Sequence, residues 1–461
     1  MWTVLLSGAM FLGFDPEVAA RWMGLTSAIL TQLLAFFLMR RCLRHSPLLW
    51  AAPGWLLALH SGFVMEAVQG LETIFFALLV LTGVFLFLED FPAMSHAVGS
   101  PRWPLSGVLF ALAALTRPEG ALLFAVMMIV RAAQIRRRSG RPGRTDLVWM
   151  ISFALPLASH LMFRLWYYGD WLPNTFYAKT GGGLAQAARG MSYAAHGLWQ
   201  VAPWVLLAGQ ALWTRPGSSA PHPAGAGKWL LATLWITSVS GVIAVGGDFK
   251  PTYRFLIWSL PLLAVLASHG VDRLWQATSP PRRAARFALP AMTIAVCLAW
   301  AFWGTAPARD FAHQRLLDLA VLREASGWFQ QHLAPNALIA TGPVGAIPYY
   351  TGRRTLDMWG LTDREIGHRA MPRMGSGAPG HEKGDGIRVL SQRPDIILFT
   401  AARFSQAPLP EVAVARGFLY VSERELLALP DFPRLYRWKS VRLPSVVMNF
   451  YERRNIQPDA L

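Results

Sequence analysis

The sequence predicts an α-helical multi-pass membrane protein that ends in a soluble α/β domain. Of its 461 residues, 54% are hydrophobic and only 15% are charged, which is far more apolar than a soluble domain. Several apolar runs approach the roughly 20 residues that cross a bilayer. After Ala306 the pattern changes to short β-prone runs that alternate with amphipathic helical stretches. We therefore expect a transmembrane domain over 1–305 and an α/β domain over 306–461.

The net charge of +17 would suit a nucleic-acid-binding protein. Much of this charge, however, lies in short Arg clusters between apolar runs, which is the pattern of cytoplasmic loops in membrane proteins. We therefore expect membrane lipids as surroundings and no nucleic acid as a partner. Cys42 lies in an Arg-rich connector and Cys297 in an apolar run, so neither a disulfide nor a metal site is indicated.

The first apolar stretch, residues 1–14, is too short to cross a bilayer and is expected to form an interfacial helix. The first full-length span is expected at 18–39, and Arg40 and Arg41 mark its cytoplasmic end. The pattern predicts further spans, about ten in all, at 47–63, 71–89, 104–116, 120–131, 147–167, 197–213, 228–246, 254–270 and 287–305.

The alternation of spans indicates which segments share a membrane face. The Arg clusters within 131–144 and 273–286 fall on the same side as Arg40 only if Arg117-Pro118-Glu119-Gly120 divides one long helix into two. We therefore prefer the divided helix. The polar segments that then share the extracytoplasmic face are Asp15 to Glu17, Glu66 to Glu72, Arg117 to Glu119, Asp170 to Lys179 and Gly246 to Arg254. The α/β domain is expected on this face as well.

Two of these segments carry cations suited to an anion. Arg117 could hold a lipid phosphate in a bidentate manner, although an ion pair with Glu119 that closes a Pro and Gly hairpin explains the same residues. Lys250 and Arg254 could hold an anion together beside Asp248, and the alternative there is a snorkelling cluster at the interface.

The segment from Tyr167 to Lys179 combines Asp170, Asn174 and Lys179 with aromatic rings. These side chains suit a sugar or a lipid headgroup, whereas an aromatic belt at headgroup depth has equal weight. In the α/β domain, His381 to Asp385 offers an acid, a base and a cation, but it follows a Gly-rich loop at 375–380 that we expect to be mobile. A structural role is preferred for His381 to Asp385. No nucleotide-binding or zinc motif appears in the sequence.

Five motifs are spread over nearly the whole chain, and they are more specific jointly than singly. They are Leu115 to Gly120, Tyr167 to Thr175, Gly246 to Phe255, Leu356 to Arg364, and Pro379 to Lys383. Jointly they resemble the GT-C glycosyltransferases that use polyprenyl-phosphate sugars. Among these, the chain is similar to the mycobacterial terminal arabinofuranosyltransferases and their bacterial homologues.

The resemblance implies an inverting transfer of a sugar from a polyprenyl-phosphate donor to a glycan or lipid acceptor of the cell envelope. It also implies a bacterial inner membrane as the location. Some GT-C relatives use a metal and others do not, so a divalent cation stays open and no metal ligand is assigned. The matching positions imply donor-phosphate binding by Arg117, Lys250 and Arg254, substrate binding by Glu119, Asn174 and Lys179, and catalytic roles for Asp170 and Asp248.

One departure from the family concerns the beginning of the chain. Family members usually begin with an additional span and an external loop that carries an Asp-Asp pair, thought to supply the general base. Met1 to Leu6 resembles the apolar run that follows this loop. We therefore expect that the span and the base are missing here, and that the chain as it stands is inactive.

Two other classes of function compete with the glycosyltransferase. A transporter or lipid flippase also contains broken helices and buried polar groups, but the sequence has no inverted repeat and its polar clusters gather on one face. The remaining class is a non-catalytic sensor or assembly partner, in which the membrane part only anchors the α/β domain.

Overall fold

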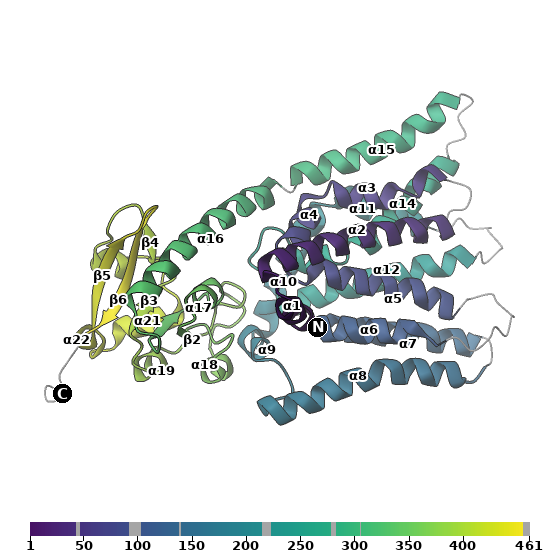
Figure 1. Ribbon diagram of the computed structural model, residues 1–461. Coiled ribbons are helices and arrows are strands. Elements are labelled where there is room, and N and C mark those ends of the chain that lie inside the picture. Colours follow the sequence, from purple (N-terminus) through teal and green to yellow (C-terminus); the bar gives the residue numbers. More distant parts are fainter. Residues whose placement is uncertain are drawn as a thin grey trace. The chain divides into compact units, whose positions relative to one another are not determined.

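The computed structural model describes residues 1–42, 47–91, 103–137, 140–213, 223–277, 283–304 and 306–454 (Figure 1). The chain forms two compact units. Unit 1 consists of Met1–Trp171 and Gly190–Asp310, and unit 2 consists of Leu172–Arg189 and Phe311–Leu461. The change of unit at Asp310 lies close to the domain boundary expected after residue 305. The inclusion of Leu172–Arg189 in unit 2 was not expected from the sequence.

Unit 1 is helical. Its elements are α1 (Trp2–Phe11), α2 (Pro16–Cys42), η1 (Pro47–Leu49), α3 (Ala52–Ala58), α4 (Ser61–Val68), α5 (Thr73–Asp90), α6 (Leu105–Thr116), α7 (Glu119–Arg137), α8 (Arg144–Tyr168), most of α10 (Gly183–Trp199), α11 (Ala202–Leu212), α12 (Pro223–Val245), α13 (Arg254–Ile257), α14 (Leu260–Ala277) and α15 (Arg283–Gly304).

Among the described residues, four helices are long and apolar enough to cross a membrane. They are Pro16–Arg41, Thr73–Asp90, Arg144–Tyr168 and Gly227–Val245. Shorter apolar helices account for several of the other expected spans, and the total of about ten spans stays a prediction. Arg138 and Arg282, which belong to the expected basic connectors, lie outside the described residues.

The expected helix break is present: α6 ends at Thr116 and α7 begins at Glu119. Arg117 is extended, with φ −144° and ψ 138°, because a residue that precedes proline avoids the helical region. By contrast, the expected single span at 47–63 is wrong. His60 there adopts an extended conformation, and its ring accepts a hydrogen bond from the Phe63 N–H, so that α4 begins anew.

The helices of unit 1 approach closely where glycines face a neighbour. A Cβ atom at Gly107 of α6 would lie 2.1 Å from the Ser152 hydroxyl of α8, and one at Gly270 of α14 would lie 2.0 Å from the Leu207 carbonyl of α11. Small residues permit such approaches between membrane helices. In the core of unit 1, Phe124 stacks on Phe153, with their ring centroids 3.7 Å apart.

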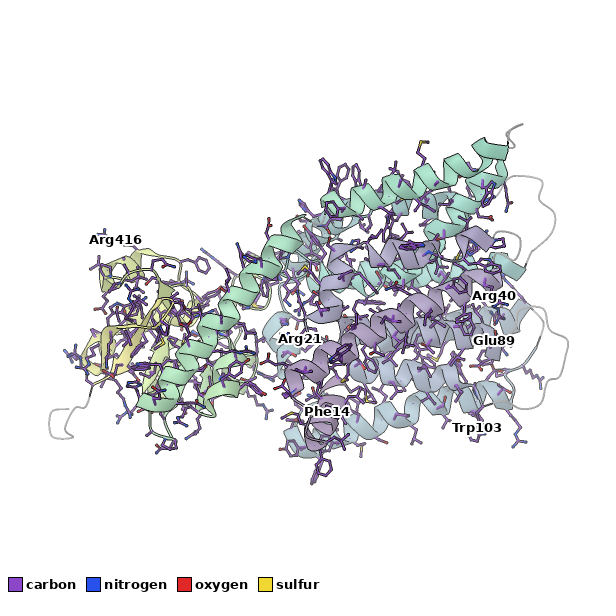
Figure 2. The ribbon with its side chains drawn as sticks, turned by 45° about the horizontal axis from the view of Figure 1, so that its top comes forward. Phe14, Arg21, Arg40, Glu89, Trp103 and Arg416 are labelled. Carbon is purple, nitrogen blue, oxygen red and sulfur yellow. The ribbon has the colours of Figure 1, made fainter. Side chains whose placement is uncertain are left out.

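Figure 2 shows Arg40 and Glu89 at one end of the unit 1 helices, with Phe14 and Arg21 at the opposite end. At the Arg40 end, Arg41 forms an ion pair with Glu89, and the Arg131 Nε donates to Asp146 at 2.6 Å. The basic connectors that the sequence assigns to the cytoplasm therefore share one end, whereas the membrane orientation itself stays a prediction.

Unit 2 contains a mixed sheet with helices around it. Its elements are α9 (Asn174–Lys179), the first turns of α10, most of α16 (Ala306–His332), β1 (Leu338–Thr341), α17 (Ala346–Thr351), β2 (Arg354–Asp357), α18 (Arg364–His368), α19 (Gly386–Ser391), β3 (Ile396–Leu398), β4 (Phe404–Ser405), α20 (Glu411–Arg416), α21 (Val421–Ala428), α22 (Phe432–Leu435), β5 (Tyr436–Arg442) and β6 (Val447–Arg453).

The strand order is β2-β1-β3-β6-β4, with β5 paired to β6. Strand β1 is parallel to β2 and β3, and β6 is antiparallel to its partners. Successive residues of β1 enter different cores, Ile339 packing with Phe329 and Ala340 with Phe399. Both faces of the sheet are therefore covered, which confirms the predicted α/β class.

Candidate functional site

Three polar segments of unit 1 meet at the end of the helices opposite Arg40. They are the α4–α5 turn from Glu66 to Thr73, the α6–α7 break from Arg117 to Glu119, and the α12–α13 loop from Gly246 to Arg254. Hydrogen bonds and ion pairs join the three segments in spite of their separation along the chain. The sequence predicted that these segments share one face, and they form one cluster of charged side chains, here called the polar cluster.

Arg117 is the most enclosed cation of the polar cluster, with 8% of the residue exposed. Its Nη2 donates to the Glu119 carboxylate at 2.9 Å, and its Nη1 donates to the Glu72 carboxylate at 3.2 Å. The guanidinium carbon lies 5.8 Å from the ring centroid of Phe76 and 5.2 Å from that of Phe255. Two carboxylates and two aromatic rings therefore fix this guanidinium group.

The bonds of Arg117 leave part of its donor capacity unused. Hydrogen bonds to described residues engage one N–H each on Nε, Nη1 and Nη2. An arginine has five N–H donors, so two remain for an oxygen-rich ligand. The ion pair with Glu119, which the sequence offered as an alternative explanation, is present and is compatible with a bound anion.

The α12–α13 loop requires glycine at its start. Gly246 and Gly247 have φ angles of 83° and 71°, in the left-handed region, and a Cβ atom on Gly247 would lie 2.5 Å from the Tyr193 ring. After this turn, Asp248 forms an ion pair with Arg254, and the Lys250 ammonium donates to the Gln69 amide oxygen at 3.3 Å. Two of the expected phosphate-binding cations therefore lie on one short loop.

Sequence reasoning missed Glu66 as an individual site residue. Its carboxylate is fully buried and accepts hydrogen bonds from Thr252 at 3.0 Å and from Thr73 at 3.2 Å. The signal that could have revealed it is a lone carboxylate within the apolar run Phe63 to Val68, because intramembrane acids usually mark functional sites.

The remaining expected site residues lie outside the polar cluster. Asp170 follows Gly169, the left-handed C-cap of α8 in unit 1. Asn174 belongs to unit 2, where its amide donates to the carbonyls of Gly360 at 2.8 Å and Asp363 at 2.9 Å. Lys179 is also in unit 2, and its aliphatic stem lies against Gly380. The side-chain N–H groups of Asn174 thus bind the backbone near α18 within unit 2.

The segment from His381 to Asp385 has structural contacts, as the sequence indicated. Glu382 accepts from the N–H groups of Gly375 at 2.8 Å and Gly377 at 2.7 Å, and it forms an ion pair with Arg189 at 2.9 Å. The Lys383 ammonium donates to the Gly367 carbonyl at 2.6 Å. The Gly-rich loop, which we expected to be mobile, is therefore tied down by a buried carboxylate.

Asp357 organises the turn that follows β2. Its carboxylate accepts from the N–H groups of Trp359 at 2.8 Å and Thr362 at 2.7 Å. Burial raises the pKa of the Asp357 carboxyl above its ordinary value, and these hydrogen bonds offset only part of the effect. The motif from Leu356 to Arg364 thus has a structural explanation within unit 2.

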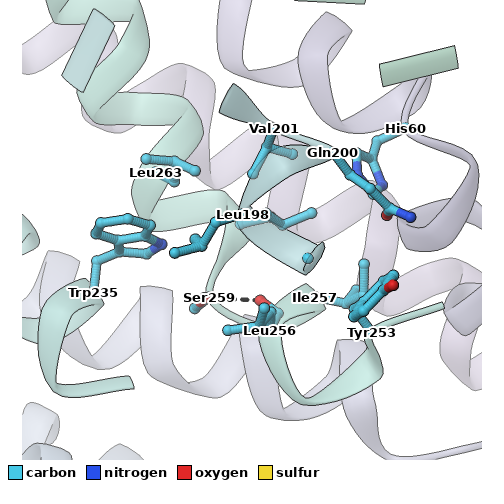
Figure 3. A pocket seen from close by; sticks show the side chains of 12 residues that line it. His60, Leu198, Gln200, Val201, Trp235, Tyr253, Leu256, Ile257, Ser259 and Leu263 are labelled. Carbon is cyan, nitrogen blue, oxygen red and sulfur yellow. Dashed lines mark hydrogen bonds between the residues drawn. The ribbon is translucent and has the colours of Figure 1, made fainter. Parts of the chain in front are cut away.

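Figure 3 shows a small enclosed cavity in unit 1, where His60 and Gln200 lie beside each other and Tyr253 and Ser259 complete its polar lining. Its volume of about 10 Å³ is close to the minimum for one water molecule, so it is no sugar pocket. Over the described ranges, no group of three or more His, Cys, Asp and Glu residues is placed to hold a metal ion.

The fold of the chain is similar to that of a protein of known structure. ArnT from Cupriavidus metallidurans, solved in the apo state, matches with a TM-score of 0.54 over 93% of this chain and 83% of that chain. The chain therefore shares the fold of ArnT. At 13% sequence identity the match shows this fold alone, and the likeness to arabinofuranosyltransferases stays a prediction.

Two further comparisons add little about activity. A family model described as a domain of unknown function, DUF8728, matches residues 310–445 of this chain. That range lies almost wholly within unit 2, so the helical unit that holds the polar cluster is outside the match. No curated protein matches the chain.

Proposed function

We propose that this chain is a membrane glycosyltransferase of the bacterial inner membrane that takes its sugar from a polyprenyl-phosphate donor. The observation that carries this proposal is the convergence of Arg117, Lys250 and Arg254 at one end of a GT-C-type helical unit. A lipid-linked phosphate stays at the membrane surface while its tail remains in the bilayer. Cations at the ends of spanning helices, instead of at their centres, match that geometry.

Arg117 is the central phosphate ligand of this proposal. Its two remaining N–H donors can bind phosphate oxygens in the planar geometry that guanidinium prefers. Lys250 and Arg254 add positive charge on the neighbouring loop. When the bond between the anomeric carbon and the phosphate oxygen breaks, negative charge develops on the phosphate, and these fixed cations stabilise it.

The remaining roles follow the family resemblance. In an inverting transfer, an acceptor hydroxyl attacks the anomeric carbon, the donor phosphate leaves, and a carboxylate takes the hydroxyl proton. Asp248 and Asp170 are proposed for catalytic roles in this transfer, and the general base is assigned to neither. Glu119, Asn174 and Lys179 are proposed substrate contacts. A divalent cation is a further proposal, which a chelator tests directly.

The proposed acceptor is a glycan or lipid of the cell envelope on the extracytoplasmic side. This follows from the topology predicted by the sequence, in which the basic connectors face the cytoplasm. Arg40 lies at the end of the unit 1 helices opposite Arg21 (Figure 2). Gly70, in the α4–α5 turn of the polar cluster, lies beside Ala20 at the Arg21 end. This arrangement supports the placement of the donor site on the extracytoplasmic side.

A deletion strain tests the proposal. Loss of one sugar from the envelope glycans, together with accumulation of its polyprenyl-phosphate form, is the expected result. Complementation with R117A should leave the defect, whereas R131A should restore the sugar because Arg131 belongs to an Arg–carboxylate pair at the other end of unit 1. Unchanged envelope glycans and donor levels in the deletion strain would overturn the proposed function.

A further inference from the structure

Glu66 lies inside the polar cluster without a role in the mechanism above. We infer that Glu66 is a positioning residue, which fixes the loop that carries Lys250 and Arg254 by accepting a hydrogen bond from Thr252. This inference rests on the proposed function, because it assigns a purpose to the loop. Glu66 acts through Thr252 and is not proposed as a catalytic residue, since its side chain is fully buried.

The hydrogen bonds of Glu66 connect two different parts of unit 1. Its Oε1 accepts from the Thr252 hydroxyl at 3.0 Å, and its Oε2 accepts from the Thr73 hydroxyl at 3.2 Å. A buried carboxylate is costly unless it is hydrogen-bonded or paired with a cation. The hydrogen bonds from the two threonines therefore offset part of the cost of burying the Glu66 carboxylate.

Thr252 is the contact through which Glu66 acts on the cations. It is 1% exposed and lies between Lys250 and Arg254 in the sequence. Three residues further on, Gln69, the C-cap of α4, accepts from the Lys250 ammonium at 3.3 Å. Residues three positions apart share one face of a helix, so a single face of α4 holds the loop at two points, Thr252 and Lys250.

Charge adds to this attachment. The positive charges of Lys250 and Arg254 both act on the Glu66 carboxylate. A negative charge near two cations lowers the repulsion between them. Binding of a phosphate depends on the position of each cation as well as on its charge.

Glu66 could instead serve only to join α4 to α5 through Thr73. The two hydroxyls provide a matched comparison, because each donates one hydrogen bond to one oxygen of the same buried carboxylate. T252V and T73V remove these bonds one at a time with little change in volume. T252S keeps the hydroxyl and serves as the conservative control.

The experiment measures the binding of undecaprenyl phosphate to the full chain in lipid nanodiscs. We expect T252V to weaken binding about tenfold, an effect within the range for residues that act on a site without touching its ligand, whereas T73V and T252S should bind as the wild type does. Thermal unfolding of each variant gives the structural readout. If positioning is the role, T252V and T73V lose similar stability and differ only in binding.

Two results would overturn parts of the account separately. Equal affinity of T252V and T73V, when the wild type binds, removes the positioning role of Glu66 and leaves the proposed function intact. Absence of binding by the wild-type chain removes the proposed donor site itself, and the positioning role with it.

Discussion

Arg117 and Arg254 lie against the same aromatic ring: the guanidinium carbon of each is 5.2 Å from the ring centroid of Phe255. Two like charges at one ring would repel each other, but Glu119 pairs with the first and Asp248 with the second. The face of an aromatic ring also attracts cations. Phe255 therefore sets the spacing between two of the three proposed phosphate ligands.

Replacement of Phe255 by leucine tests this spacing. F255L keeps an apolar side chain but removes the ring face, so we expect weaker binding of a polyprenyl phosphate, by an amount equivalent to about 1 kcal/mol. F153L is the matched control, because Phe153 stacks on Phe124 within the core of unit 1. Titration of both variants in nanodiscs checks the prediction, and equal affinities would contradict it.

Replacement of Asp357 by alanine should destabilise unit 2. The N–H groups of Trp359 and Thr362 would lose their acceptor, and leaving buried donors unpaired costs about 1–3 kcal/mol each. D431A is the control, since Asp431 forms only an exposed pair with Arg434, which contributes little. Thermal unfolding of the full chain should show a lower transition for D357A alone.

Glu452 should make the stability of unit 2 depend on pH. Burial opposes its ionisation, but hydrogen bonds from Lys439 and Arg437 outweigh this effect and lower the pKa of the Glu452 carboxyl below its ordinary value. Its contribution is therefore fully present above the ordinary value and is lost as the pH falls through the lowered pKa. E452Q should unfold with a smaller acid dependence than the wild type, and identical pH profiles would refute this.

The Glu382 carboxylate should protect the loop at 375–380 from proteases. E382A removes the acceptor of the Gly375 and Gly377 N–H groups and leaves Arg189 without its carboxylate partner. We therefore expect faster cleavage within this loop during limited proteolysis, located by mass spectrometry. D431A, which removes an exposed pair with Arg434, is the control and should be cleaved at the wild-type rate.

Local sequence patterns were enough for the helix break and for the fold class. Pro118 removes a backbone donor and restricts Arg117, so the break needs no long-range information. The apolar runs and the β-prone runs likewise indicated the helical unit and the α/β unit before any contact was known.

Contacts between distant segments were beyond the reach of local patterns. The substrate-binding role of Asn174 stays a prediction, but no local pattern indicated that its amide bonds to the carbonyls of Gly360 and Asp363, which are 186 and 189 positions away. A lone carboxylate in an apolar run could have pointed to Glu66 itself, but no local pattern indicates its bond to Thr252, which is also 186 positions away. The hydrophobic period of a short stretch of sequence identifies one helix or strand. It does not show which distant segment contacts that element.

The central claim is that Arg117 binds the phosphate of a polyprenyl donor. Binding of undecaprenyl phosphate to the full chain in nanodiscs tests it most directly, with R117K and R131K compared in parallel. Lysine keeps the charge but not the bidentate geometry, so R117K should bind at least about tenfold more weakly, while R131K should equal the wild type. Wild-type affinity in R117K would contradict the account.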